Sequence, residues 1–246
     1  MGIGYREVSF KYPDSTVDPS FYENYEFSEE LDQAFDELLD ENYVRNFYIG
    51  DRKPGLDTRH EILDFGSDMA FVYPIERSID RYLDEGAKSV YWYVFAYEGG
   101  RNRNKFRQNL TSEGATHGDD VGYLWTMDLF PDEPTADDQR IIDAMTKLWT
   151  DFAKFGNPTP SGPTELVPLT WESIKDEKRP YLLIDKTLSL EGRPFSKRMS
   201  FLDVYYKLHS NKITGIKTSG TGRLFSDIGY FVVIFWALVT VLRVPE

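Results

Sequence analysis

Residues 89–97 have the sequence SVYWYVFAY, which is apolar or aromatic at nearly every position. β-Branched and aromatic side chains of this kind favour β-strands. Because apolar residues do not alternate with polar ones, both faces of the strand must be covered, as they are in a sheet with helices on both sides. The stretch therefore predicts the central strand of an α/β sheet.

Amphipathic helices are predicted on both sides of this strand in the sequence. Apolar residues there recur at intervals of three and four. A capping-box pattern at Thr135 opens the clearest of these helices, and Gly156 ends it. In chain order we expect helices from Ser28, over residues 58–65, from Ser67 to Gly86, from Thr135 to Gly156 and over residues 195–208. Residues 101–108 read as a basic, Asn-rich loop, and residues 181–184 as a last hairpin or edge strand.

The overall charge is strongly acidic. The chain of 246 residues has 28 Lys and Arg against 41 Asp and Glu, which gives a net charge of −13. Because phosphate binding needs clustered basic residues, nucleic acid is not expected as a partner. The sequence contains no cysteine, which excludes Cys nucleophiles, zinc–thiolate sites and disulfides within it.

The composition changes near the C-terminus. Residues 212–222 are small and polar, and residues 209–229 read as a linker. An uncharged apolar run then begins at Tyr230 and ends at Leu242. We therefore divide the chain into residues 1–208, 209–229 and 230–242. A membrane span needs about 20 apolar residues. The shorter run here leaves four readings open: membrane contact, a lipid-anchor signal, a buried helix or aberrant sequence. The N-terminus does not have the pattern of a signal peptide.

A loop with a histidine follows the predicted central strand. Residues 114–124 (GATHGDDVGYL) contain His117, one of only three histidines in the chain. Histidine accepts and returns a proton near neutral pH, and the flanking glycines allow a tight loop. A histidine base needs a carboxylate that holds its tautomer and stabilises the imidazolium. One acidic residue, Glu7, follows a short strand-like segment and precedes His117 by 110 positions.

Several segments resemble the type-B carboxylesterases, a family that includes cholinesterases and insect juvenile-hormone and detoxification esterases. The resemblance extends to about residue 207 and matches the C-terminal half of that family. The most specific matches are residues 115–120 (ATHGDD) and 149–158 (WTDFAKFGNP). The other matches are residues 4–7 (GYRE), 67–71 (SDMAF), 91–95 (YWYVF) and Trp171. The family usually has Gly after the acid, whereas Val8 follows Glu7 here.

The resemblance implies an α/β-hydrolase fold and hydrolysis of small carboxylic esters. A serine hydroxyl would attack the ester carbonyl while His117 takes its proton, and Glu7 would be the acid of the catalytic triad. Asp68 falls where the family has a buried acid near the triad, although an Asp at the start of a helix is most often a cap. This chemistry requires no metal and no cofactor. Secretion or membrane association is the expected localisation of the full-length relatives.

The nucleophile of this chemistry is missing from the sequence, because no Gly-x-Ser-x-Gly segment occurs in it. The glycine-rich oxyanion segment is missing too. We therefore expect no esterase turnover from this chain alone. The alternative is a non-catalytic binding or adhesion protein on the same fold, attached to a membrane through residues 230–242. The presence of both Glu7 and His117 favours the partial esterase, because a binding protein need not keep both.

Asn109 begins an N-glycosylation sequon, Asn109-Leu110-Thr111, in a polar stretch of the chain. Because the resembling family is largely secreted, Asn109 is a candidate glycosylation site. A glycan at this position would have to point away from the active site, since the sequon is close to His117 in the sequence.

Overall fold

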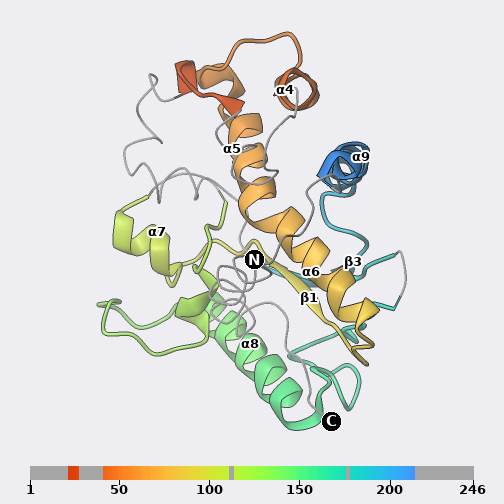
Figure 1. Ribbon diagram of the computed structural model, residues 1–246. Coiled ribbons are helices and arrows are strands. Elements are labelled where there is room, and N and C mark those ends of the chain that lie inside the picture. The colour runs from red at the N-terminus through yellow and green to blue at the C-terminus, as the bar shows by residue number, and fades with distance from the viewer. Residues whose placement is uncertain (1–21, 28–40, 111–113, 176–177, 214–246) are drawn as a thin grey trace, which may run out of the picture. The chain divides into compact units, whose positions relative to one another are not determined.

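The computed structural model describes residues 22–27, 41–110, 114–175 and 178–213 (Figure 1). Glu7, the expected helix from Ser28 and the apolar residues 230–242 lie outside this part of the chain. The described residues form two compact units. One unit consists of Ser78–Pro194, and the other contains the described residues up to Arg77 together with those from Phe195 onward.

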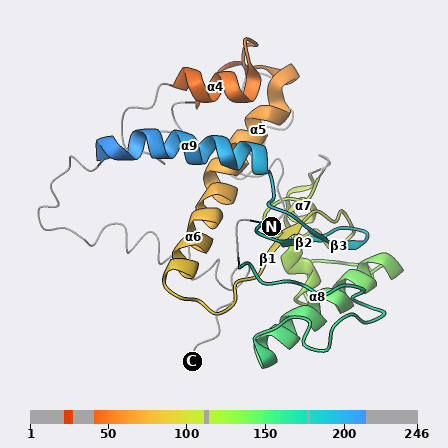
Figure 2. The ribbon, with the colours of Figure 1, turned by 90° about the vertical axis from the view of Figure 1, so that its right-hand side faces the viewer.

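A small mixed sheet forms the middle of the Ser78–Pro194 unit (Figure 2). Its strands are β1 (Trp92–Phe95), β2 (Tyr181–Ile184) and β3 (Leu188–Glu191), in the order β1-β2-β3. β1 and β2 are parallel, and β2 and β3 form an antiparallel hairpin. The buried strand in residues 89–97 and the hairpin after residue 181 are thus confirmed. Within the described sheet, however, the middle strand is β2 and not β1.

Helix α8 (Ala136–Phe155) covers the sheet and has the ends expected from the sequence. The Thr135 hydroxyl accepts a hydrogen bond from the Asp138 N–H, and Gly156 ends the helix in the left-handed conformation with φ 65°. The apolar side of α8 and the strands share one core, made of Tyr93, Phe95, Ile141, Ala144, Met145, Leu148, Leu182 and Ile184 with their neighbours. Each large aliphatic side chain buried in this way stabilises the fold by about 1.5–3 kcal/mol.

The expected loop over residues 101–108 is instead helix α7 (Arg103–Gln108). The next helical element along the chain is the short 3₁₀ helix η3 (Asp120–Tyr123). The loop prediction was wrong because no side chain next to α7 in the sequence caps it. Its N-cap residue, Asn102, makes no side-chain capping hydrogen bond. The cap comes from a residue further along the chain.

The second unit is helical. It contains α4 (Glu41–Ile49), η1 (Leu56–Thr58), α5 (Arg59–Ser67), the π-helical turn η2 (Asp68–Val72), the start of α6 (Tyr73–Asp84) and α9 (Ser196–Ile213). The break expected near Ser67 is absent, because the backbone stays helical from Arg59 through η2 into α6. Helix α9 confirms the helix expected over residues 195–208, although it continues past residue 208. It buries Met199, Leu202 and Tyr205.

Candidate active site

The loop that carries His117 lies between α7 and η3. His117 is half-buried, and its carbonyl oxygen accepts a hydrogen bond of 2.7 Å from the Asn104 side-chain amide. Gly118 follows with φ 70°, a left-handed conformation that glycine adopts without a steric cost. The glycine after the histidine is therefore required by the shape of the turn.

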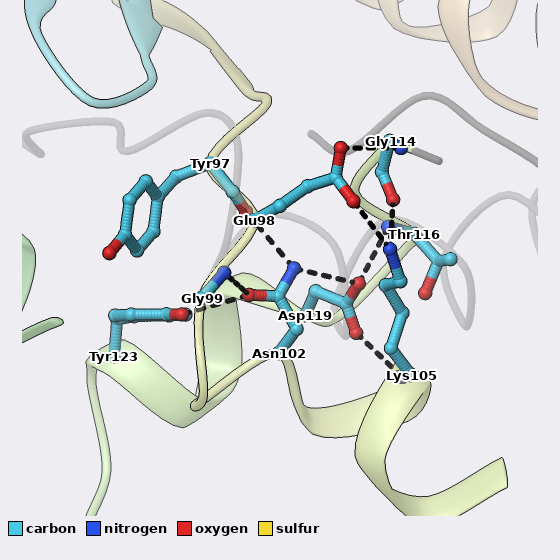
Figure 3. A network of polar contacts seen from close by, with 9 residues as sticks. All are labelled: Tyr97, Glu98, Gly99, Asn102, Lys105, Gly114, Thr116, Asp119 and Tyr123. Carbon is cyan, nitrogen blue, oxygen red and sulfur yellow. Dashed lines mark hydrogen bonds and ion pairs between the residues drawn. The ribbon is translucent and has the colours of Figure 1, made fainter. Parts of the chain in front are cut away.

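Asp119 is fully buried and joins this loop to α7 (Figure 3). One carboxylate oxygen accepts hydrogen bonds from the N–H groups of Asn104 (2.8 Å) and Lys105 (3.0 Å) at the start of α7. The other accepts from the Thr116 N–H (2.7 Å) and from the Asn102 amide (3.2 Å). Asp119 thus supplies the cap that α7 lacks locally. The sequence marked Asp119 only as part of the 115–120 match, because two of its donors, the N–H groups of Asn104 and Lys105, belong to a helix that was not predicted.

Asn102 continues the same network toward the end of β1. Its amide also donates to the Tyr97 carbonyl (3.0 Å), while its side-chain oxygen accepts from the Gly99 N–H (2.9 Å) and the Tyr123 hydroxyl (2.8 Å). The Asp138 carboxylate, at the start of α8, accepts from the Tyr97 hydroxyl (3.3 Å). Burial, with the charge of Asp138, raises the pKa of Tyr97 to about 12, so this hydroxyl remains a hydrogen-bond donor at neutral pH.

Lys105 and Glu98 hold the beginning of the His117 loop. The Lys105 ammonium contacts the Glu98 carboxylate (2.7 Å) and the Gly114 carbonyl (2.9 Å), and Glu98 accepts from the Gly114 N–H (2.7 Å). Burial alone would raise the pKa of Glu98. The hydrogen bonds from Lys105 and Gly114 outweigh that effect and lower it, so Glu98 stays ionised at neutral pH.

Asp120 attaches the far side of the loop to the sheet. It is 2% exposed and accepts a hydrogen bond of 2.8 Å from the Tyr93 hydroxyl of β1. Burial and the neighbouring Asp120 carboxylate raise the pKa of Tyr93 well above its ordinary value. The two consecutive acids after His117 therefore point to different elements, Asp119 to α7 and Asp120 to β1.

Gly122 allows η3 to lie directly against the chain before α7. A Cβ atom there would be 2.0 Å from the Arg101 carbonyl oxygen and 3.0 Å from the Phe130 ring. We expect Gly122→Ala to lower the free energy of unfolding by about 1–3 kcal/mol, the usual cost of overpacking. Urea titration followed by circular dichroism measures this difference.

Gly192→Ala is the matched control for Gly122→Ala. An added Cβ at Gly192 meets only the Lys178 carbonyl, at 4.0 Å, so its unfolding curve should stay close to that of the parent chain. Equal stability of the two variants would contradict the close approach at Gly122.

An open concavity of about 480 Å³ lies beside the network. It is lined by Glu98, Gly99, Gly100, Asn102, Lys105, Phe106, Asn109 and Leu110. Asn109 ends α7 in the left-handed conformation with φ 52°, and its side chain is exposed. The sequon asparagine is therefore accessible to solvent in the described structure.

Asp68 is completely buried in the helical unit, and its carboxylate contacts other side chains and not the start of a helix. It accepts a hydrogen bond from the Tyr48 hydroxyl (2.8 Å) and is paired with the Arg198 guanidinium, whose Nε lies 2.6 Å from its carboxylate. Arg198 also contacts Asp64 (2.6 Å). Burial raises the pKa of Asp68 to about 6 despite the opposing effect of Arg198. The sequence could not show this role, because Arg198 lies 130 positions away.

Two further properties of the described residues concern cofactors and membranes. No group of three or more His, Cys, Asp or Glu side chains within them is placed to hold a metal ion. None of the helices in that part of the chain combines the length and apolar character needed to cross a membrane.

Comparison with known proteins gives one family. The model of the carboxylesterase family matches residues 8–202. Esterase E4 of Myzus persicae is 27% identical over 47% of this chain and 21% of its own length. Juvenile hormone esterase of Tribolium castaneum is 30% identical over 55% of this chain and 24% of its own length. The human bile salt-activated lipase is 28% identical over 57% of this chain and 18% of its own length.

A solved structure supports the same fold. The crystal structure of juvenile hormone esterase from Manduca sexta, with OTFP covalently attached, superposes with a TM-score of 0.55 at 20% identity. The likeness covers 82% of this chain and 36% of that chain. The predicted α/β fold is confirmed, and the chain spans about a quarter of the length of the curated relatives that it matches.

Proposed function

Because this chain belongs to the carboxylesterase family of α/β-hydrolases, we propose that it is part of a serine esterase and contributes His117 as the general base. The observation that carries the proposal is that buried polar contacts fix the loop around His117. The loop around it is held by two buried carboxylates, Asp119 and Asp120, and by the Lys105–Glu98 pair. A base acts efficiently when its position relative to the reacting atoms is fixed before substrate arrives.

In the proposed reaction His117 accepts the proton of a serine hydroxyl as that hydroxyl attacks the ester carbonyl. It then protonates the leaving alcohol, and a water molecule repeats the sequence to release the acid. Glu7 is proposed as the carboxylate that orients the imidazole. The serine is not in this sequence, which has no Gly-x-Ser-x-Gly segment, so a second portion of the enzyme must provide it.

The proposed substrate is a small carboxylic ester, and its acyl and alcohol groups are not specified by the described residues. Secretion or membrane association is part of the same proposal. The exposure of Asn109 is compatible with a glycan at the sequon. The proposed membrane contact through residues 230–242 lies outside the described residues.

An activity assay with a chromogenic acetate ester tests the proposal. The 246-residue chain alone is expected to show no turnover above buffer, because without a nucleophile no acyl-enzyme can form. The same chain, joined to the portion of a related esterase that carries Gly-x-Ser-x-Gly, is expected to hydrolyse the ester.

Two outcomes would contradict this view. Turnover by the chain alone that is lost in His117→Gln would show that the chain holds its own nucleophile. A correctly folded joined protein that covalently binds no serine-directed inhibitor would favour the non-catalytic binding protein.

A further inference from the structure

We propose that Asp119 is a positioning residue that, together with Asn104, fixes the backbone on both sides of His117. The inference rests on the proposed role of His117 as a base. It assigns a task to two residues that do not touch a substrate in that proposal.

Two hydrogen-bonded ties hold the backbone on either side of His117. On its N-terminal side, the Thr116 N–H donates to the Asp119 carboxylate at 2.7 Å. On its C-terminal side, the His117 carbonyl accepts from the Asn104 amide at 2.7 Å. The Asn104 N–H itself donates to Asp119 at 2.8 Å. The two ties therefore meet at the first turn of α7, and the backbone at His117 cannot rotate without breaking one of them.

The contacts of Asp119 go beyond those of a simple helix cap. A cap for α7 would need only the oxygen that accepts from Asn104 and Lys105. The other oxygen of Asp119 binds Thr116 and Asn102, which are not part of α7. One carboxylate thus holds the helix and the loop in a single arrangement. The Asp119 N–H also donates to the Thr116 carbonyl (3.1 Å), which closes the turn around His117.

Only a carboxylate satisfies all the hydrogen-bond donors at this site. Four N–H donors converge on Asp119, and an ionised carboxylate offers about four acceptor positions and no donor. In Asp119→Asn, one oxygen becomes an NH₂ group that faces two N–H donors, whichever way the amide is turned. The side chain can then hold α7 or the His117 loop, but not both.

Nuclear magnetic resonance of the whole chain, labelled in its histidine rings, tests the proposal. The chain has only three histidines, so the ring signal of His117 can be identified by its loss in His117→Gln. In the parent chain we expect one sharp His117 signal. In Asp119→Asn, measured well below its Tm, we expect that signal to split or broaden through exchange, while the signal of the exposed His60 stays unchanged.

Leu148→Ala is the control for lost stability. Leu148 is fully buried in the core of the same unit and has no polar role. Its truncation should lower the Tm without changing the His117 signal. A merely structural Asp119 would behave in the same way, so an unchanged His117 signal in folded Asp119→Asn overturns the proposal.

Asn104→Ala keeps the proposal testable if Asp119→Asn does not fold. This variant retains the backbone N–H that donates to Asp119. It removes the tie to the His117 carbonyl, together with the hydrogen bond of 3.1 Å that the Asn104 side-chain oxygen accepts from the Arg103 guanidinium. We expect broadening of the His117 signal here too, and an unaltered signal would again overturn the proposal. The measurement needs no ester turnover, so a failure of the esterase assay and a failure of this inference are read separately.

Discussion

His117→Gln, made in the chain joined to a portion that carries the serine, is expected to lower kcat by about 10²–10⁴-fold, the usual contribution of a general acid–base residue. Glutamine is close to histidine in size but cannot accept a proton near neutral pH. The tie between Asn104 and the carbonyl at position 117 involves the backbone, so the substitution leaves it in place. The loss should therefore reflect proton transfer and not collapse of the loop.

Steady-state kinetics with a chromogenic acetate ester, supported by thermal unfolding curves, measure this effect. His60→Gln is the matched control, because His60 is an exposed histidine in α5. We expect this substitution to leave kcat unchanged. If His117→Gln kept the parent kcat with the same KM, His117 would not be the base.

The second large effect is expected from Arg198→Met, which leaves Asp68 buried without its cation. Arg198 lies in α9 and contacts Asp68 and Asp64. Breaking a buried ion pair by removing one partner costs about 3–5 kcal/mol of unfolding free energy. We expect a loss of this size near pH 8, where the Asp68 carboxylate is ionised, measured by urea titration.

The loss should shrink as the pH falls. Burial raises the pKa of Asp68 in the folded chain to about 6, from an ordinary 3.8. The folded state therefore binds this proton more tightly than the unfolded state, and the stability that Asp68 contributes is present below pH 3.8 and lost as the pH rises through 6. In Arg198→Met the carboxyl group can protonate near pH 5, where a neutral Asp68 no longer needs a cation.

Arg81→Met is the control for an ordinary surface pair. The Arg81–Glu85 pair is exposed, with side-chain exposures of 78% and 59%, so its removal should cost less than about 1 kcal/mol and show little dependence on pH. Equal losses at pH 5 and pH 8 in Arg198→Met would contradict the role assigned to Asp68. Partial recovery in Arg198→Lys would separate the charge from the forked geometry of the guanidinium.

The structural features that were predicted correctly arise from neighbours along the chain. The capping box at Thr135 and the glycine at residue 156 act within one turn of α8, and both ends of that helix are as expected. The unbroken apolar run around β1 is buried because each of its side chains has a covered face to occupy. Tyr181–Ile184 forms one arm of a hairpin, as the short spacing to β3 requires.

The prediction failed where the stabilising partner is distant in the sequence. Helix α7 was read as a loop because its cap, Asp119, comes 15 positions after Asn104. For Asp68, the resemblance implied a buried acid, but its pairing with Arg198 was not predicted because Arg198 is 130 positions away. His117 was found as the candidate base from its residue type and its resemblance to a family, but neither showed what holds it.

Short-range patterning of apolar, capping and glycine residues was thus sufficient to identify the α/β class, helix α8 and the loop of His117. The support of that loop and the state of the buried acids depended on tertiary contacts. A carboxylate can cap a helix, hold a loop or form an ion pair. Its role depends on which N–H groups and cations the fold brings within hydrogen-bonding distance. For Asp119 those groups include N–H groups of α7, and for Asp68 they include the Arg198 guanidinium of α9, and only the folded chain places them there.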